Sequence, residues 1–216
     1  MITIYGAYSF PPFLDGLVRH HRVMWAAEEV GLPYQVHWLD TSKGEHKEEA
    51  NRAINPFGKI PSMEDGPMKL FESGAMVNYI FEKAGRAPRD TESRAKLAQW
   101  CYAALNTVEI TTLDILRYDT FWRDKPGYEW RRPESVDVGK TRMAELDAAL
   151  GDKPYLLGDE ISPADILMVS VIDFARTAPE IMERAPRIAA YMKRCLGRPA
   201  YLRAKDTQNQ APKLAA

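Results

Sequence analysis

The stretch from residue 55 to residue 74, NPFGKIPSMEDGPMKLFESG, constrains the fold more than any other part of this sequence. Two short strand-like runs, at residues 62–65 and 68–71, flank a Gly-Pro turn signal. Pro61 precedes the first run, has no N–H to donate to a sheet, and favours extended geometry at Ile60. The pattern therefore predicts a β-hairpin whose entrance leaves the Ile60 backbone free to pair with something outside the fold.

A helical pattern begins where the hairpin ends, at Glu72 and Ser73. Taken alone, Ser73 is a helix cap and Glu72 is an acidic residue favoured by the helix dipole. The same helix N-terminus also favours an anionic ligand group, because its first N–H groups have no partner within the helix. Beside the free Ile60 backbone, these two residues indicate a site for an extended, peptide-like, anionic molecule.

The residues before the hairpin predict a larger α/β domain. Residues 2–5 and 34–39 have β-type patterns, and residues 18–30 between them form a helical pattern that stops at Gly31. Residues 42–54 are polar and predict a surface helix or an irregular segment. The resulting order, β-α-β-α-β-β-α, is that of a thioredoxin-like fold.

The second half of the chain carries helical patterns only, so we expect an all-α second domain. The expected boundaries are 1–84 for the first domain, 85–92 for a linker, 93–204 for the helical domain and 205–216 for a frayed tail. The predicted helices cover residues 95–116, 138–150, 163–175 and 187–196. Residues 118–133 are rich in aromatic residues and arginine, and we interpret them as a loop or as part of a substrate wall.

The sequence Ser162-Pro163-Ala164-Asp165 predicts a helix start. Ser162 and Asp165 have the spacing of a capping box, and Pro163 stands where a missing N–H costs nothing. The helix that follows is apolar nearly all round, which predicts the buried centre of the second domain.

Charge and cysteine content exclude several classes of protein. The 216 residues include 29 basic and 30 acidic side chains, a net charge of −1, which argues against a nucleic acid or an anionic membrane as the main partner. The two cysteines, Cys101 and Cys195, do not form a disulfide framework. With no secretory signal in the first residues, we expect a cytoplasmic protein.

Residues 44–80, GEHKEEANRAINPFGKIPSMEDGPMKLFESGAMVNYI, resemble the glutathione-binding half of a cytosolic glutathione S-transferase, of the phi-like type and its bacterial relatives. Further on, YLLGDEISPADILM resembles the capping motif of that family's second domain. The resemblance implies the glutathione transferase fold, a thioredoxin-like α/β domain followed by an all-α domain. It also implies a cis proline at Pro61, a homodimer and a role in detoxification.

The resemblance assigns glutathione, as a co-substrate, to named residues. The Ile60 backbone, beside Pro61, pairs with the cysteinyl part, Glu72 takes the γ-glutamyl amino group and Ser73 its carboxylate. The resemblance assigns the glycyl carboxylate to His46 and Lys47. Lys59 occupies a further position of the family's glutathione-binding motif.

A transferase also needs a donor to the glutathione thiolate. The resemblance places it between the first strand and the first helix, where Ser9 is our first choice, with Tyr8 and Tyr5 as alternatives. The family pattern sets the catalytic serine about five residues before Arg22, where this chain has Leu17.

The segment between Ser9 and Arg22 is thus an insertion of about eight residues relative to that pattern. Because of this insertion, His20 and His21 are further candidates for the thiol donor. The alternative interpretation is that both are exposed polar residues in the first turn of a helix. Its apolar residues Phe13 and Leu14 predict a lid over the second substrate.

Tyr118, Phe121 and Trp122 are further candidates for the substrate wall, with core packing as the equal alternative. The sequence has no His/Cys/Asp cluster with metal-ligand spacing and no nucleotide-binding loop, so we expect no metal and no nucleotide.

We therefore expect a glutathione transferase that conjugates the glutathione thiolate to a small hydrophobic electrophile, whose identity the sequence leaves open. A glutathione-dependent lyase or thiol reductase is a second hypothesis, although such enzymes usually have a cysteine near position 9 and the first cysteine here is Cys101. A third is a glutathione-binding protein of this fold without turnover.

Overall fold

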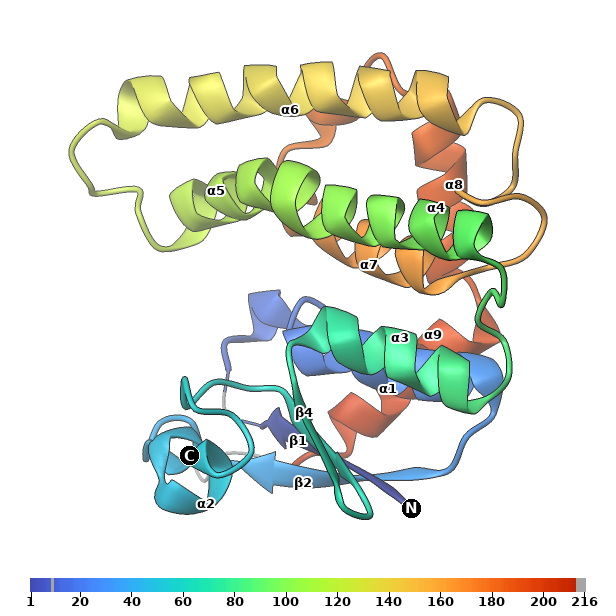
Figure 1. Cartoon of the computed structure of the whole chain (residues 1–216). Helices are drawn as coiled ribbons and strands as arrows, with labels where there is room; N and C mark the ends of the chain where they lie inside the picture. Colours follow the sequence, from blue (N-terminus) through green and yellow to red (C-terminus); the bar gives the residue numbers. More distant parts are fainter. Residues whose placement is uncertain (9, 213–216) are drawn as a thin grey trace. The chain divides into compact units, whose positions relative to one another are not determined.

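The structure is a computed structural model that describes residues 1–8 and 10–212 of the chain. These residues form two compact units. The first unit comprises Met1–Ala87 together with the chain from Arg198 onward, and the second comprises Pro88–Gly197. Figure 1 shows the helices and strands of both.

A four-stranded sheet organises the first unit, with the strand order β2-β1-β3-β4. The central strand β1 pairs parallel with β2 and antiparallel with β3, and β3 pairs antiparallel with β4. The strand bounds are Ile2–Ala7 for β1, Tyr34–Leu39 for β2, Ser62–Asp65 for β3 and Met68–Phe71 for β4. The predicted thioredoxin-like order and both strands of the hairpin are thereby confirmed.

The helices of this unit follow the predicted order. Helix α1 packs against β1 and α3, and Trp25 in its middle is fully buried. The predicted polar segment 42–54 contains a short 3₁₀ turn and then α2. The bounds are Arg19–Val30 for α1, Glu45–Lys47 for the 3₁₀ turn, Glu49–Arg52 for α2 and Ser73–Lys83 for α3.

The end of the chain differs from the sequence expectation. Instead of a frayed tail from residue 205, helix α9 (Pro199–Asn209) continues the chain and packs on α1 (Figure 1). Tyr201 contacts the rings of His21 and Trp25, with centroids 4.9 and 5.1 Å apart. Helix α9 therefore belongs to the first unit and not to the helical one.

Polar contacts hold the first half of α9 and its N-cap residue at the C-terminal end of α1. Arg198 Nε lies 2.9 Å from the carboxylate of Glu29, and Arg203 Nε lies 2.6 Å from that of Glu28. The buried face of α9 is narrow, comprising Ala200, Tyr201, Ala204 and Gln208, and most of its other residues are polar. An amphipathic pattern with so few apolar residues gives little signal in the sequence.

The second unit is helical, as predicted. Its elements are α4 (Thr91–Tyr102), a π-helical segment (Ala103–Val108), α5 (Glu109–Thr120), α6 (Tyr128–Leu150), α7 (Pro163–Ile172), 3₁₀ turns at Asp173–Ala175 and Pro179–Met182, and α8 (Pro186–Leu196). The structure corrects the predicted start of α6, because the helix begins directly after Gly127 and includes Pro133.

Asp165 is the polar centre of the second unit. The predicted capping box is present, with the Ser162 N–H donating to Asp165 Oδ2 over 2.9 Å. The other carboxylate oxygen accepts from the Leu156 N–H at 2.8 Å and from the Tyr191 hydroxyl at 3.0 Å. Burial raises the pKa of the Asp165 carboxyl, while these hydrogen bonds act in the opposite direction. The Asp165 side chain thus connects α7 to α8 and to the loop that precedes α7.

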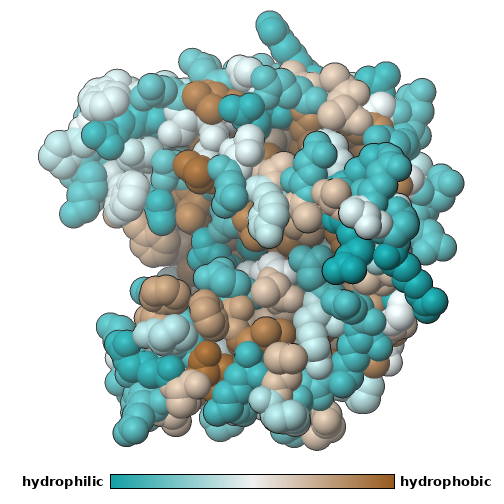
Figure 2. Space-filling view, viewed as in Figure 1, coloured by the Kyte–Doolittle hydropathy of each residue, from teal (hydrophilic) through white to brown (hydrophobic). Residues whose placement is uncertain are grey.

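Several large hydrophobic side chains are exposed on the surface. Large exposed hydrophobic side chains such as Phe57, Ile110 and Trp130 belong to different elements, and Figure 2 shows hydrophobic residues scattered among hydrophilic ones on the visible face. None of the helices among residues 1–8 and 10–212 is long and apolar enough to cross a membrane.

We predict that Asp165→Ala lowers the unfolding free energy of the second unit by about 3 kcal/mol, because buried donors on Leu156 and Tyr191 lose their acceptor. Guanidinium unfolding followed by near-ultraviolet circular dichroism measures the change. Asp159→Ala, at an exposed position just before α7, is the matched control and should leave the midpoint in place. Equal midpoints for the two variants would contradict the central role of Asp165.

Candidate functional site

Two asparagines hold the loop that leads into the hairpin. The Lys59 carbonyl accepts from Asn51 Nδ2 at 3.3 Å and from Asn55 Nδ2 at 2.9 Å. On the other side of the Ile60-Pro61 pair, the buried Ser62 hydroxyl donates to Asn51 Oδ1 over 2.6 Å. The Asn51 side chain therefore holds the chain on both sides of the Ile60-Pro61 pair, and Asn55 adds a second contact on the Lys59 side.

The backbone of Ile60 is available to a ligand. The Ile60-Pro61 peptide bond is cis, as the resemblance implied. Among the residues that the structure describes, none forms a hydrogen bond with the N–H or the C=O of Ile60. An extended peptide unit beside this loop would satisfy both groups.

The N-terminus of α3 is open. Glu72 and not Ser73 occupies the N-cap position, which corrects the expected cap, and no side-chain hydrogen bond caps the helix. Ser73 is the first helical residue and is buried. The first N–H groups of the helix thus keep their capacity for an anion.

Glu72 itself holds an unusual backbone conformation. Its φ of 69° is the only positive value of a non-glycine residue in the described part of the chain. Such a conformation costs on the order of 1–3 kcal/mol and occurs preferentially at functional sites. The exposed Glu72 side chain stands directly before the open end of α3.

Basic side chains gather at the other end of the site. The pKa of His46 is lowered by desolvation first and then by the positive charges of Lys47, Lys59 and Arg52. These cations therefore act on one place, close to the loop that Asn51 holds. A ligand carboxylate at this place would be attracted by these positive charges. In the absence of such a carboxylate, His46 is neutral at pH 7.

Two of the three expected thiol donors have other hydrogen-bond partners. The Tyr5 hydroxyl donates to Glu64 over 2.6 Å, and burial with this contact raises the pKa of Tyr5 to about 12. The Tyr8 hydroxyl donates to Asp40 over 3.1 Å, and desolvation and this contact raise the pKa of Tyr8. Ser9 lies outside the described residues.

The histidines at the start of α1 are buried, contrary to the exposed alternative that the sequence offered. Burial lowers the pKa of His20 to about 3, with a smaller contribution from the charge of His21. The His20 ring lies 5.7 Å from the ring of Trp38. Leu17, at the position of the family's serine, is buried too. His20 is thus neutral and enclosed.

The inserted segment contains one short regular element, a 3₁₀ turn at Pro12–Leu14 that includes Phe13 and Leu14. Asp15 binds α9, with its carboxylate 2.9 Å from Gln208 Nε2 and 3.0 Å from Lys205 Nζ.

The aromatic residues proposed for the substrate wall lie at the end of α5. Tyr118 is buried and packs against Trp122, with ring centroids 5.5 Å apart, while Phe121 is exposed. Both interpretations of Tyr118, core packing and substrate wall, are compatible with this position, because Tyr118 also lines a hollow with Ile110 and Trp130.

Three residues of this site were missed by the sequence analysis. Asn51 and Asn55 position the Lys59 carbonyl, and Arg52 donates to the carbonyls of Lys47 and Pro56. Asn51 lies on the four-residue helix α2 and Asn55 three residues beyond its end, so helical spacing gave no signal for the pair. Within residues 1–8 and 10–212, no group of three or more His, Cys, Asp or Glu side chains has a metal-binding arrangement.

Two family models match parts of this chain. The family model described as "Glutathione S-transferase, N-terminal domain" matches residues 14–82, and that described as "Glutathione S-transferase, C-terminal domain" matches residues 140–194. Fold and site define a protein with a thioredoxin-like ligand-binding unit and a helical unit. The two matches together span more than half of the chain, which belongs to the glutathione S-transferase family.

Similar proteins come from plants and animals. Glutathione S-transferase F14 of Arabidopsis thaliana is 27% identical over 86% of this chain and 78% of its own length. Glutathione S-transferase theta-1 of Rattus norvegicus is 28% identical over 90% of this chain and 86% of its own. The crystal structure of poplar glutathione transferase F1 has a TM-score of 0.83 at 24% identity and covers 97% of this chain and 99% of that one, which supports the fold.

We predict that Glu72→Gly stabilises the protein and weakens ligand binding. Glycine adopts a positive φ without strain, so the melting temperature should rise by about 2–4 °C. The lost carboxylate should lower retention on immobilised glutathione. Glu72→Ala is the matched control, because it removes the carboxylate and keeps the strain, so retention should fall without a rise in melting temperature. A lower melting temperature for Glu72→Gly would show that the backbone at Glu72 is not strained.

Proposed function

We propose that this protein binds glutathione across its first unit and transfers the glutathione thiolate to a small hydrophobic electrophile. One observation carries the proposal. The free Ile60 backbone, the open N-terminus of α3 at Glu72 and Ser73, and the basic cluster around His46 all belong to the same unit. Glutathione offers a matching peptide with an amino group and two carboxylates.

Each end of glutathione has a chemical partner here. Glu72 binds the γ-glutamyl amino group, and the Ser73 hydroxyl with the first N–H groups of α3 binds the adjacent carboxylate. The Ile60 backbone, held next to Pro61, pairs with the cysteinyl peptide unit. His46, Lys47 and Lys59 attract the glycyl carboxylate, and the charge of Arg52 adds to theirs.

The thiol donor that we propose is Ser9. A free thiol has a pKa of about 8.5, so lowering it by two units, about 2.7 kcal/mol, makes the thiolate the major form at pH 7. A hydroxyl that donates to the thiolate acts in this direction. The hydrogen bonds of Tyr5 and Tyr8 to carboxylates favour Ser9 over both, and Tyr8 stays the second choice.

We further propose Phe13, Leu14, Tyr118 and Trp122 for contacts with the electrophile, a homodimer as the working form, and detoxification as the role. The names of the relatives support the transfer reaction. Buried Leu17 at the family's serine position favours one rival, a glutathione-binding protein without turnover. Retention on glutathione without conjugation of 1-chloro-2,4-dinitrobenzene would establish that rival.

We predict that the double variant Glu72→Ala/Ser73→Ala loses retention on immobilised glutathione while its circular dichroism spectrum is unchanged. Both residues are proposed partners of the γ-glutamyl end, so the affinity should fall at least about tenfold. Glu82→Ala, exposed on the last turn of the same helix, is the control. Retention within twofold of the parent would show that the ligand does not use the start of α3.

We also predict that Ser9→Ala raises the pKa of the bound glutathione thiol by about one unit, because the thiolate loses a hydrogen bond. The thiolate absorbance in the ultraviolet should then appear at higher pH, and kcat should fall at pH 7 with glutathione affinity kept. Tyr8→Phe is the matched comparison and should leave the titration in place. The reverse result, a shift for Tyr8→Phe alone, would transfer the role to Tyr8.

A further inference from the structure

The first unit contains a second hollow, away from the residues assigned to glutathione. It lies between β2, the second half of α1 and the end of α9, and its volume is about 550 Å³. The hollow is open to solvent on one side and is large enough for a small organic molecule to lie in it. None of its lining residues is among those proposed to bind glutathione.

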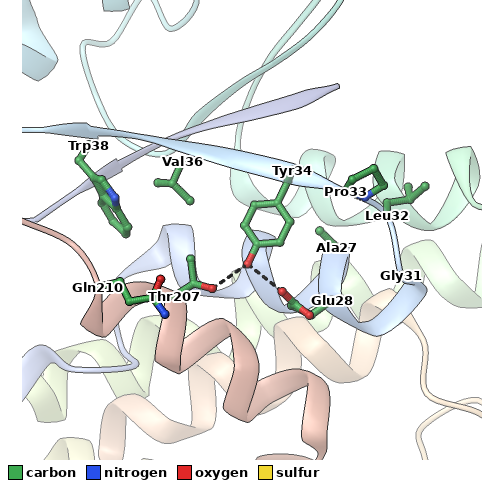
Figure 3. A pocket seen from close by; sticks show the side chains of 10 residues that line it. All are labelled: Ala27, Glu28, Gly31, Leu32, Pro33, Tyr34, Val36, Trp38, Thr207 and Gln210. Atoms are coloured by element: carbon green, nitrogen blue, oxygen red, sulfur yellow. Dashed lines mark hydrogen bonds between the residues drawn. The ribbon is translucent and has the colours of Figure 1, made fainter.

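One wall of the cavity is apolar and aromatic. Tyr34, Val36 and Trp38 alternate along β2 and project from the same face of the strand, as Figure 3 shows. A strand rises by about 3.3 Å per residue, so the two aromatic residues are attached about 13 Å apart with Val36 between them. The result is a slot with a ring at each end, suited to a flat molecule of bicyclic size.

The opposite wall presents hydrogen-bond acceptors. The single proton of the Tyr34 hydroxyl is donated to Glu28 Oε1 at 3.1 Å or to Thr207 Oγ1 at 3.3 Å, the two contacts drawn in Figure 3. The Thr207 hydroxyl donates to the Arg203 carbonyl over 3.1 Å. Because both hydroxyl protons are used in these contacts, the oxygens of Tyr34 and Thr207 can each accept a hydrogen bond from a ligand. Burial raises the pKa of Tyr34 to about 12, so the phenol stays protonated at pH 7.

The acceptor oxygens at this wall disfavour an anionic ligand. Glu28 is the acidic lining residue, and its Oε2 is paired with Arg203 Nε at 2.6 Å. Because the guanidinium already balances this carboxylate, a ligand need not carry positive charge. A carboxylate on the ligand would instead meet Glu28 and two acceptor oxygens.

We propose that this cavity binds an uncharged, planar, bicyclic aromatic molecule that carries a hydrogen-bond donor. The rings lie in the slot over Val36 between Tyr34 and Trp38, and the donor points to the hydroxyl oxygens of Tyr34 and Thr207. Occupancy is independent of the glutathione residues, so both ligands are bound together.

The test uses 6-aminoquinoline as the probe and quinoline-6-carboxylate as its anionic counterpart, each titrated calorimetrically into the full chain with and without saturating glutathione. We expect saturable binding of one 6-aminoquinoline that glutathione does not displace. The carboxylate should bind at least about tenfold more weakly. Absence of saturable binding, equal binding of the two probes, or displacement by glutathione would each overturn the proposal.

Two substitutions on neighbouring positions of β2 locate the probe. Val36→Trp fills the slot and should weaken 6-aminoquinoline binding at least about tenfold, whereas Gln35→Trp, on the exposed opposite face, should leave it unchanged. If Val36→Trp does not fold, Thr207→Val removes an acceptor at nearly constant volume and should also weaken binding. If the folded Val36→Trp or Thr207→Val variant binds 6-aminoquinoline with unchanged affinity, the probe binds elsewhere and the proposal is wrong.

Discussion

The burial of α1 is the constraint on which the first unit depends. Eight consecutive residues, from His20 to Ala27, are buried, which spans more than two helical turns and requires cover on every side. The sheet and α3 supply cover on two sides, and α9 supplies the third. Between β2, the second half of α1 and the end of α9 the packing is incomplete, and the cavity lined by Tyr34 and Trp38 remains.

Local chemistry explains which parts of the fold could be predicted. The hairpin was predicted with its bounds because proline, the turn and the strand residues act within a few positions of one another. Helix α9 was missed because its stability comes from distant partners, such as Glu28 and Glu29, that no window of sequence contains. The start of α6 was missed because residues 118–133 were interpreted as a loop or as part of a substrate wall, although the loop ends at Gly127 and the helix accommodates Pro133.

At the candidate site too, features of local sequence were predicted, whereas contacts between distant residues were not. Motif residues such as Ile60 and Glu72 were found from the sequence, and their free backbone groups and positive φ are consistent with ligand binding. The contacts that position them were not found, because Asn51 acts through the Lys59 carbonyl and the Ser62 hydroxyl, which only the folded chain brings together. The burial of His20 likewise depends on Trp38, eighteen positions further along the chain.

The attachment of α9 to the first unit has a consequence for biosynthesis. Residues 88–197 emerge from the ribosome between the two parts of that unit. At about 5–20 residues per second, the sheet and α1 wait on the order of 10 s for their last helix. During this interval the side of α1 that Tyr201 later covers is exposed to solvent and to chaperones. The helical unit receives its whole sequence by the end of the interval, before α9 is made. The part of the protein that is made first is thus completed last.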